Sequence, residues 1–146
     1  MDDRVKFASL ILACHLGVLS KNHIIAIADQ RISELNEIEP WLAEISLYGK
    51  SAELDGLIVR GYSDDVYAES LRMLFQSWIE GAISDENFAT SCRMLWHKAG
   101  NNSRWYEDLV WIPDEFYLVE DGVYYREDSV KKIRSSIEKI LEEFAV

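Results

Sequence analysis

The chain has 146 residues, enough for one domain with a sizeable core, and its hydrophobic content of 49% excludes an intrinsically disordered chain. Its net charge of −11, from 26 acidic against 15 basic residues, argues against direct nucleic-acid binding and fits a basic protein partner. No apolar run approaches the roughly 18–20 residues of a membrane span, and the acidic start Asp2-Asp3 argues against a secretory signal, so we expect a cytoplasmic protein without membrane contact.

The first part of the chain predicts four helices, because apolar residues recur there at intervals of three and four. Asp2 or Asp3 can cap the first, Pro40 suits the first turn of the third, and Gly49 ends it. Ser51 can cap the fourth. The expected ranges are 4–18, 21–35, from Pro40 to Gly49, and 52–60.

The stretch from Ser63 to Gly100 predicts two antiparallel amphipathic helices joined by a short turn. Ser63 and Ser84 can cap them, each followed by two acidic residues that suit the positive end of a helix dipole. Gly100 ends the second helix. The expected core positions are Tyr67, Leu71, Leu74, Phe75, Trp78 and Ala82 on the first helix and Phe88, Cys92, Leu95, Trp96 and Ala99 on the second.

The region from Asn101 to Asp128 mixes aromatic and acidic residues. Within it, Phe116–Val119 and Val123–Tyr125 flank the dipeptide Asp121-Gly122, which predicts a small β-hairpin. A last helix is expected from Ser129 to Phe144, with basic residues first and acidic residues last, an order that opposes the helix dipole and costs a few tenths of a kcal/mol per charge. The fold class is therefore mainly α: a single-domain multi-helix bundle over residues 1–146 with a small β-hairpin near residues 116–125.

The three histidines, His15, His23 and His97, form no close-spaced metal motif, and no phosphate loop or nucleophile elbow is present in the sequence. Cys14 and Cys92 fall on apolar helix faces, as reduced buried thiols do. We therefore expect no catalytic residue, metal or cofactor, and a protein that is not an enzyme.

The candidate for function is a recognition face in the acidic and aromatic region. Aromatic side chains supply buried anchors at protein interfaces, and carboxylates pair there with Arg and Lys. The alternative is that these aromatics fill the core while the acids face water. The candidate partner-binding residues are Trp105, Glu107, Asp108, Asp114, Glu115, Glu120 and Asp121.

Several segments resemble bacterial toxin-immunity proteins of the contact-dependent inhibition and polymorphic-toxin type. These segments are Ala26–Ile32, Pro40–Ser46, Phe116–Tyr117 and Asp121–Gly122. The resemblance implies a protein that binds and neutralises a cognate toxin domain, a basic nuclease, by occluding its active site or substrate groove. Two alternatives stay open: a small enzyme with an unrecognised carboxylate or His97 site, and a helical adaptor.

Overall fold

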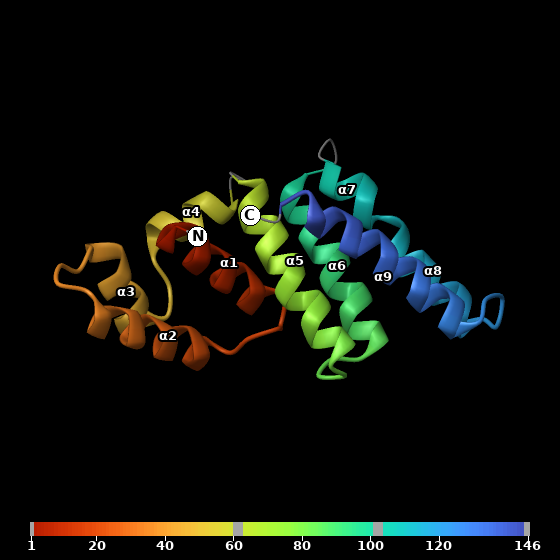
Figure 1. Ribbon diagram of the computed structural model, residues 1–146, viewed down its shortest axis with the longest axis horizontal. Coiled ribbons are helices and arrows are strands. Elements are labelled where there is room, and N and C mark those ends of the chain that lie inside the picture. Colours follow the sequence, from red (N-terminus) through yellow and green to blue (C-terminus); the bar gives the residue numbers. More distant parts are fainter. Residues whose placement is uncertain (1, 60–62, 101–103, 145–146) are drawn as a thin grey trace. The chain divides into compact units, whose positions relative to one another are not determined.

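The structure is a computed structural model that describes residues 2–59, 63–100 and 104–144, and all regular structure in these ranges is helical. Figure 1 shows the helices in chain order. Their bounds are α1 (Asp3–His15), α2 (Lys21–Glu34), α3 (Pro40–Tyr48), α4 (Ala52–Val59), α5 (Asp64–Ile79), α6 (Asp85–Ala99), α7 (Arg104–Leu109), α8 (Trp111–Glu120) and α9 (Arg126–Glu142). The mainly α fold is confirmed. The contacts divide the chain into two compact units, Met1–Ser70 and Leu71–Val146, and the single domain stays a prediction.

The first unit is built around α1, whose residues from Phe7 to Ala13 are all buried. The helix packs on α2 and α4, and α3 packs on both α2 and α4. The Trp41 ring of α3 meets the Phe7 ring edge to face, with 5.8 Å between the ring centroids. At the start of α1, Arg4 forms ion pairs with Glu39 and Glu53, so one guanidinium ties α1 to α4 and to the residue before α3.

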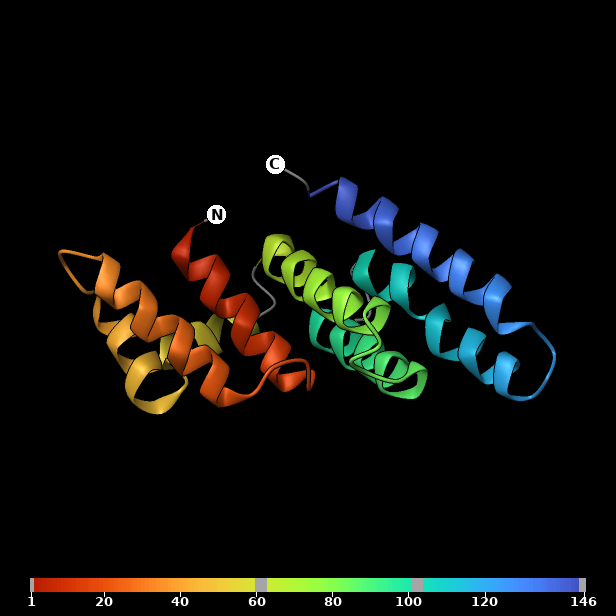
Figure 2. The same cartoon turned by 60° about the horizontal axis from the view of Figure 1, so that its bottom comes forward.

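The second unit is built around an aromatic cluster. The Trp78 ring stacks on Phe88, with 4.3 Å between the centroids, and both rings meet Phe116 edge to face. Helix α6 packs on α7 and α8, and α8 packs on α9. Figure 2 shows α8 and α9 side by side, joined by a turn at their far end. Most of the predicted apolar faces of α5 and α6 are confirmed, since the buried residues include Tyr67, Leu71, Leu74, Phe75, Trp78, Phe88, Cys92, Leu95 and Trp96. Ala82 is wrong as a core position, because α5 ends at Ile79 and Ala82 is exposed in the turn that follows, and Ala99 is half-buried.

The predicted caps of the central helices are confirmed. The Ser63 hydroxyl accepts a hydrogen bond from the Asp65 N–H at 3.2 Å, and the Ser84 hydroxyl accepts one from the Asn87 N–H at 3.1 Å. Gly100 follows α6 with a φ of 93°, a backbone conformation that glycine adopts without strain. The first helix ends at His15, three residues earlier than predicted, because Gly17 turns the chain there with a φ of 80°.

The predicted β-hairpin near residues 116–125 is wrong. Phe116 and Tyr117 belong to α8, and the dipeptide Asp121-Gly122 ends this helix instead of joining two strands. The Gly122 φ is 76°, and the Val123 N–H donates to the Leu118 carbonyl at 2.9 Å. A left-handed glycine followed by such a bond is a common helix ending. The apolar spacing of α8, with Ile112 and Phe116 buried, explains why helix prevails over the β propensity of its residues.

The expected conflict between α9 and its dipole does not arise at its N-terminus. The helix starts at Arg126, three residues before the predicted Ser129, so Glu127 and Asp128 lie in its first turn, where negative charge is favourable. Ile133, Ile137 and Ile140 are buried and form the inward face of the helix.

Candidate functional site

The seven candidate partner-binding residues do not form one surface. Two are buried: Trp105 is 1% exposed and Glu115 is 7% exposed. Two belong to α7, Glu107 and Asp108, and the remaining three belong to α8 and the turn after it, Asp114, Glu120 and Asp121. The sequence predicted one shared surface for these residues, and the structure separates them.

Trp105 packs in the core of the second unit. Its ring lies against Phe144, with 5.5 Å between the centroids, and the Arg104 guanidinium lies 5.8 Å from its centre. A side chain buried to this extent offers no surface to a partner. Its expected role as an exposed anchor is therefore wrong, and the alternative of core packing holds for this residue.

Glu115 joins α8 to α9. Its Oε1 accepts a hydrogen bond from the Ser129 hydroxyl at 2.9 Å, and its Oε2 lies 3.4 Å from the Lys132 ammonium. A buried carboxylate is tolerated where such partners replace water. Lys132 also lies over the Trp111 ring at 5.0 Å, so its charge is shared between a carboxylate and a ring face. Glu115 is accordingly a structural link between helices and not a contact residue.

Glu107 and Asp108 line a hollow of about 360 Å³ in which acidic and basic groups alternate. Arg104 lies 3.5 Å from Asp108 and 2.6 Å from Glu143, and Lys139 lines the same hollow. Because bases stand among the acids, this part of the second unit carries little uncompensated negative charge.

The outer face of α8 is different. Asp114, Tyr117 and Asp121 follow at intervals of three and four and share a face, and Glu120 lies three residues after Tyr117. All four are exposed, Tyr117 by 63%. From Trp105 to Tyr125 the sequence has six acidic residues and no Lys, Arg or His. We call these four residues the α8 ridge.

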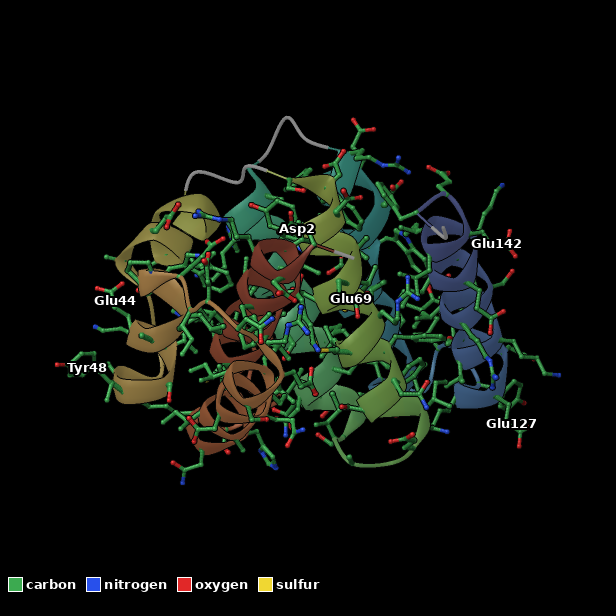
Figure 3. The ribbon with its side chains drawn as sticks, turned by 60° about the vertical axis from the view of Figure 1, so that its left-hand side comes forward. Asp2, Glu44, Tyr48, Glu69, Glu127 and Glu142 are labelled. Atoms are coloured by element: carbon green, nitrogen blue, oxygen red, sulfur yellow. The ribbon has the colours of Figure 1, made fainter. Side chains whose placement is uncertain are left out.

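The turn after the α8 ridge exposes further large apolar and aromatic side chains. Val123 is 61% exposed, Tyr124 45% and Tyr125 81%. Glu127 and Asp128 follow at the start of α9, and Figure 3 shows Glu127 at the outer end of that helix. Single exposed apolar residues are ordinary on protein surfaces, whereas three consecutive ones at a turn are a candidate contact surface. These side chains were not among the candidate partner-binding residues, because the sequence predicted a strand at Tyr124 and Tyr125.

A groove runs between α6 and α8, on one side of the α8 ridge. Its volume is about 480 Å³. The residues from α6 and its start are Asp85, Glu86, Ala89, Thr90 and Arg93, and those from α8 are Pro113, Phe116, Tyr117, Val119 and Glu120. We call it the α6–α8 groove. The sequence did not reveal this groove, although residues spaced by three and four on a helix share a face.

A smaller pocket lies between α8 and α9. Its volume is about 300 Å³, and it is lined by Tyr124 and Tyr125 of the turn together with Glu115 and Lys132. The lysine pairs with Glu115 in this pocket, and Asp128 adds a second carboxylate to its lining.

Asp85 closes one end of the α6–α8 groove and is held by three hydrogen bonds. Its two oxygens accept from Arg126 Nε at 2.7 Å and Nη2 at 2.9 Å, and Oδ1 also accepts from Trp78 Nε1 at 2.9 Å. The Arg126 guanidinium, followed by the Trp78 N–H, lowers the pKa of Asp85 below its ordinary value. Asp85 is therefore an ionised carboxylate whose charge is balanced by Arg126, and it links α5, α6 and α9.

The groups that carry metal or nucleophilic chemistry stand apart. Within the described ranges no group of three or more His, Cys, Asp or Glu residues is placed to hold a metal ion. His15 and His97 are exposed, and the His23 ring bonds to Ser20 at the start of α2. Cys92 is completely buried as a free thiol, and burial raises its pKa far above the ordinary value, which makes it a poor nucleophile.

No family model, curated protein or solved structure matches the chain. In the part of the chain that the structure describes, no helix has the length and apolar character needed to cross a bilayer.

Proposed function

We propose that this protein is an immunity-type inhibitor, which binds a basic toxin domain in the cytoplasm through the α8 ridge and the α8–α9 turn. The observation that carries the proposal is the run of exposed aromatic side chains, Tyr117, Tyr124 and Tyr125, beside acids that no base of the same stretch compensates.

Two physical effects support this role. Tyrosine rings that become buried at an interface act as anchors, and truncation of one such anchor costs about 2 kcal/mol or more. Exposed carboxylates act mainly before contact, because their field speeds the encounter with a positively charged partner. Val123 and the three tyrosines supply the first effect, and Asp114, Glu120 and Asp121 supply the second.

The proposed mechanism is occlusion. A nuclease binds a polyanion, so its active site or substrate groove is lined with Lys and Arg. A ridge of carboxylates on a helix competes for the same positive groups, while the tyrosines pack on apolar surface nearby. The resemblance to immunity proteins and the net charge of −11 support this partner class.

The test uses the protein domain encoded immediately upstream of this chain's gene. Co-expression is expected to restore growth of cells that produce the domain, and surface plasmon resonance is expected to show direct binding. The double variant Tyr124→Ala/Tyr125→Ala should raise the dissociation rate at least tenfold. Tyr48→Ala is the matched control, because Tyr48 is 61% exposed and projects from α3 in the other unit (Figure 3).

A second pair of variants tests the acids. Glu120→Gln/Asp121→Asn should slow association about tenfold at low salt, with a smaller effect at 0.5 M salt, because screening removes long-range steering. Asp64→Asn/Asp65→Asn removes the same charge from the first turn of α5 and should affect stability more than binding. Binding that is lost in the α5 pair and unchanged in the α8 pair contradicts the proposed surface. Binding without restored growth favours a helical adaptor instead.

A further inference from the structure

We infer that the α6–α8 groove receives an amphipathic helix of the basic partner, with Lys or Arg side chains at the groove end bounded by Glu86 and Glu120. The inference rests on the proposed function only in taking the partner to be basic.

The floor of the groove is apolar and shallow. Phe116 is 8% exposed and Pro113 is buried, so both present only an edge to the groove. Ala89 stands on α6 where a larger side chain would fill the space, and the resulting hollow has a volume of about 480 Å³. An apolar floor of this kind favours burial of aliphatic side chains from a partner.

The groove extends along both helices for two turns. On α6 its lining begins at Asp85, continues through Glu86 and Ala89, and ends at Arg93, seven residues after Glu86. On α8 it begins at Pro113 and ends at Glu120, also seven residues later. Seven residues of α-helix span roughly 10 Å. An amphipathic helix that binds in a groove uses anchors at i, i+3 or i+4, and i+7, and these cover the same length.

The charges of the groove are unequal at its two ends. Asp85 pairs with Arg126, which follows the end of α8, so the start of α6 lies near the end of α8. Glu86 and Glu120 therefore bound the same end of the groove. Neither has an ion pair or hydrogen bond to another residue in the described ranges. Arg93 lies two turns further along α6, which favours an occupant with its basic side chains at one end only.

The pocket between α8 and α9 does not compete for this occupant. Its lining takes only Glu115 from α8 and Asp128, Ser129 and Lys132 from α9, so it does not offer two turns of both helices to a helical occupant. The α6–α8 groove has Arg93 at one end, and its other end keeps two carboxylates that no base balances.

The test uses two fluorescein-labelled peptides of 14 residues, each with the same leucine face at helical spacing. One carries Lys on its polar face and the other carries Glu. Fluorescence anisotropy with the full chain should show binding of the Lys peptide and none of the Glu peptide. Ala89→Trp, which fills the groove, should weaken the Lys peptide at least tenfold.

Charge variants give the same test without a change of shape. Glu86→Gln/Glu120→Gln should weaken the Lys peptide by about three- to tenfold, and Arg93→Gln should strengthen it by about threefold, because the two changes shift the groove charge in opposite directions. Asp64→Asn/Asp65→Asn is the matched control: it removes the same charge from the first turn of α5, and neither residue lines the groove. Circular dichroism checks that each variant is folded.

The inference is overturned if the Lys peptide fails to bind, or if it binds equally well to the parent, to Ala89→Trp and to the groove charge variants. An equal loss with the control pair means that the overall negative charge of the chain attracts the peptide, and it overturns the groove as well. A result that refutes the groove is distinct from one that refutes the proposed function. An upstream toxin domain that binds Ala89→Trp as it binds the parent refutes only the groove.

Discussion

Replacement of Trp78 by alanine probes the aromatic cluster of the second unit. Trp78 is 5% exposed, its ring stacks on Phe88 at 4.3 Å, and its edge-to-face contact with Phe116 spans 5.8 Å between centroids. Truncation of a large buried aromatic side chain to alanine costs about 3–5 kcal/mol. The hydrogen bond from Nε1 to Asp85 adds little, because that carboxylate keeps both bonds from Arg126.

We expect Trp78→Ala to lower the free energy of unfolding by about 4 kcal/mol, a large fraction of the roughly 5–15 kcal/mol that stabilises a typical domain. With a urea m-value of about 1.5 kcal/mol per molar, the unfolding midpoint falls by roughly 2–3 M. The assay is urea titration followed by circular dichroism at 222 nm, because the substitution removes a fluorophore.

Two control variants separate the contributions. Trp78→Phe keeps a ring against Phe88 and loses the Nε1 hydrogen bond, so we expect a loss of about 1 kcal/mol. Tyr125→Ala removes an aromatic ring that is 81% exposed and should cost under about 0.5 kcal/mol. A loss below about 1 kcal/mol for Trp78→Ala would refute the view that this cluster holds the unit together.

The remaining predictions concern the two cysteines, Asp85 and Gly122. In the folded protein, a disulfide exchange reagent such as DTNB should label the half-buried Cys14 and leave the buried Cys92 unlabelled until urea is added, because burial raises the Cys92 pKa and blocks access. Asp85→Asn should lower the urea midpoint at pH 7. Arg126 lowers the Asp85 pKa in the folded state, so the stabilisation that the ionised Asp85 gives is complete above about pH 4. The difference in urea midpoint between Asp85→Asn and the parent should shrink as the pH falls through the Asp85 pKa of the folded state. Gly122→Ala should cost about 1–2 kcal/mol in the same titration, because a φ of 76° is unfavourable for alanine. An added Cβ would meet no atom within 4 Å, so the cost comes from the backbone conformation and not from a clash.

Local signals in the sequence were sufficient to locate α1 to α6 and α9, but not α7 and α8. Ser63 and Ser84, each followed by two acids, marked true helix starts, and Pro40 and Gly49 bounded α3 as predicted. Caps and breakers act within one turn of the chain, so their effect can be read without knowledge of the tertiary structure.

The error between residues 116 and 125 has a physical explanation. The aromatic residues have β propensity and the Asp-Gly pair favours a hairpin turn. A strand needs a partner strand, whereas α8 meets its hydrogen bonds internally and buries Phe116 against Trp78 and Phe88. The same error hid the exposed Tyr124 and Tyr125. Burial is likewise a tertiary property, which is why Trp105 and Glu115 could not be told from the exposed acids around them.

The Asp85 carboxylate also sets an order of events during biosynthesis. Its bond from Trp78 joins residues seven apart, and its bonds from Arg126 join residues 41 apart. At roughly 5–20 residues per second, the ribosome adds those 41 residues in about 2–8 seconds. For most of that interval the aromatic cluster also lacks Phe116, which follows Asp85 by 31 residues. The pair between Asp85 and Arg126 therefore forms only after α6, α7 and α8 have been synthesised.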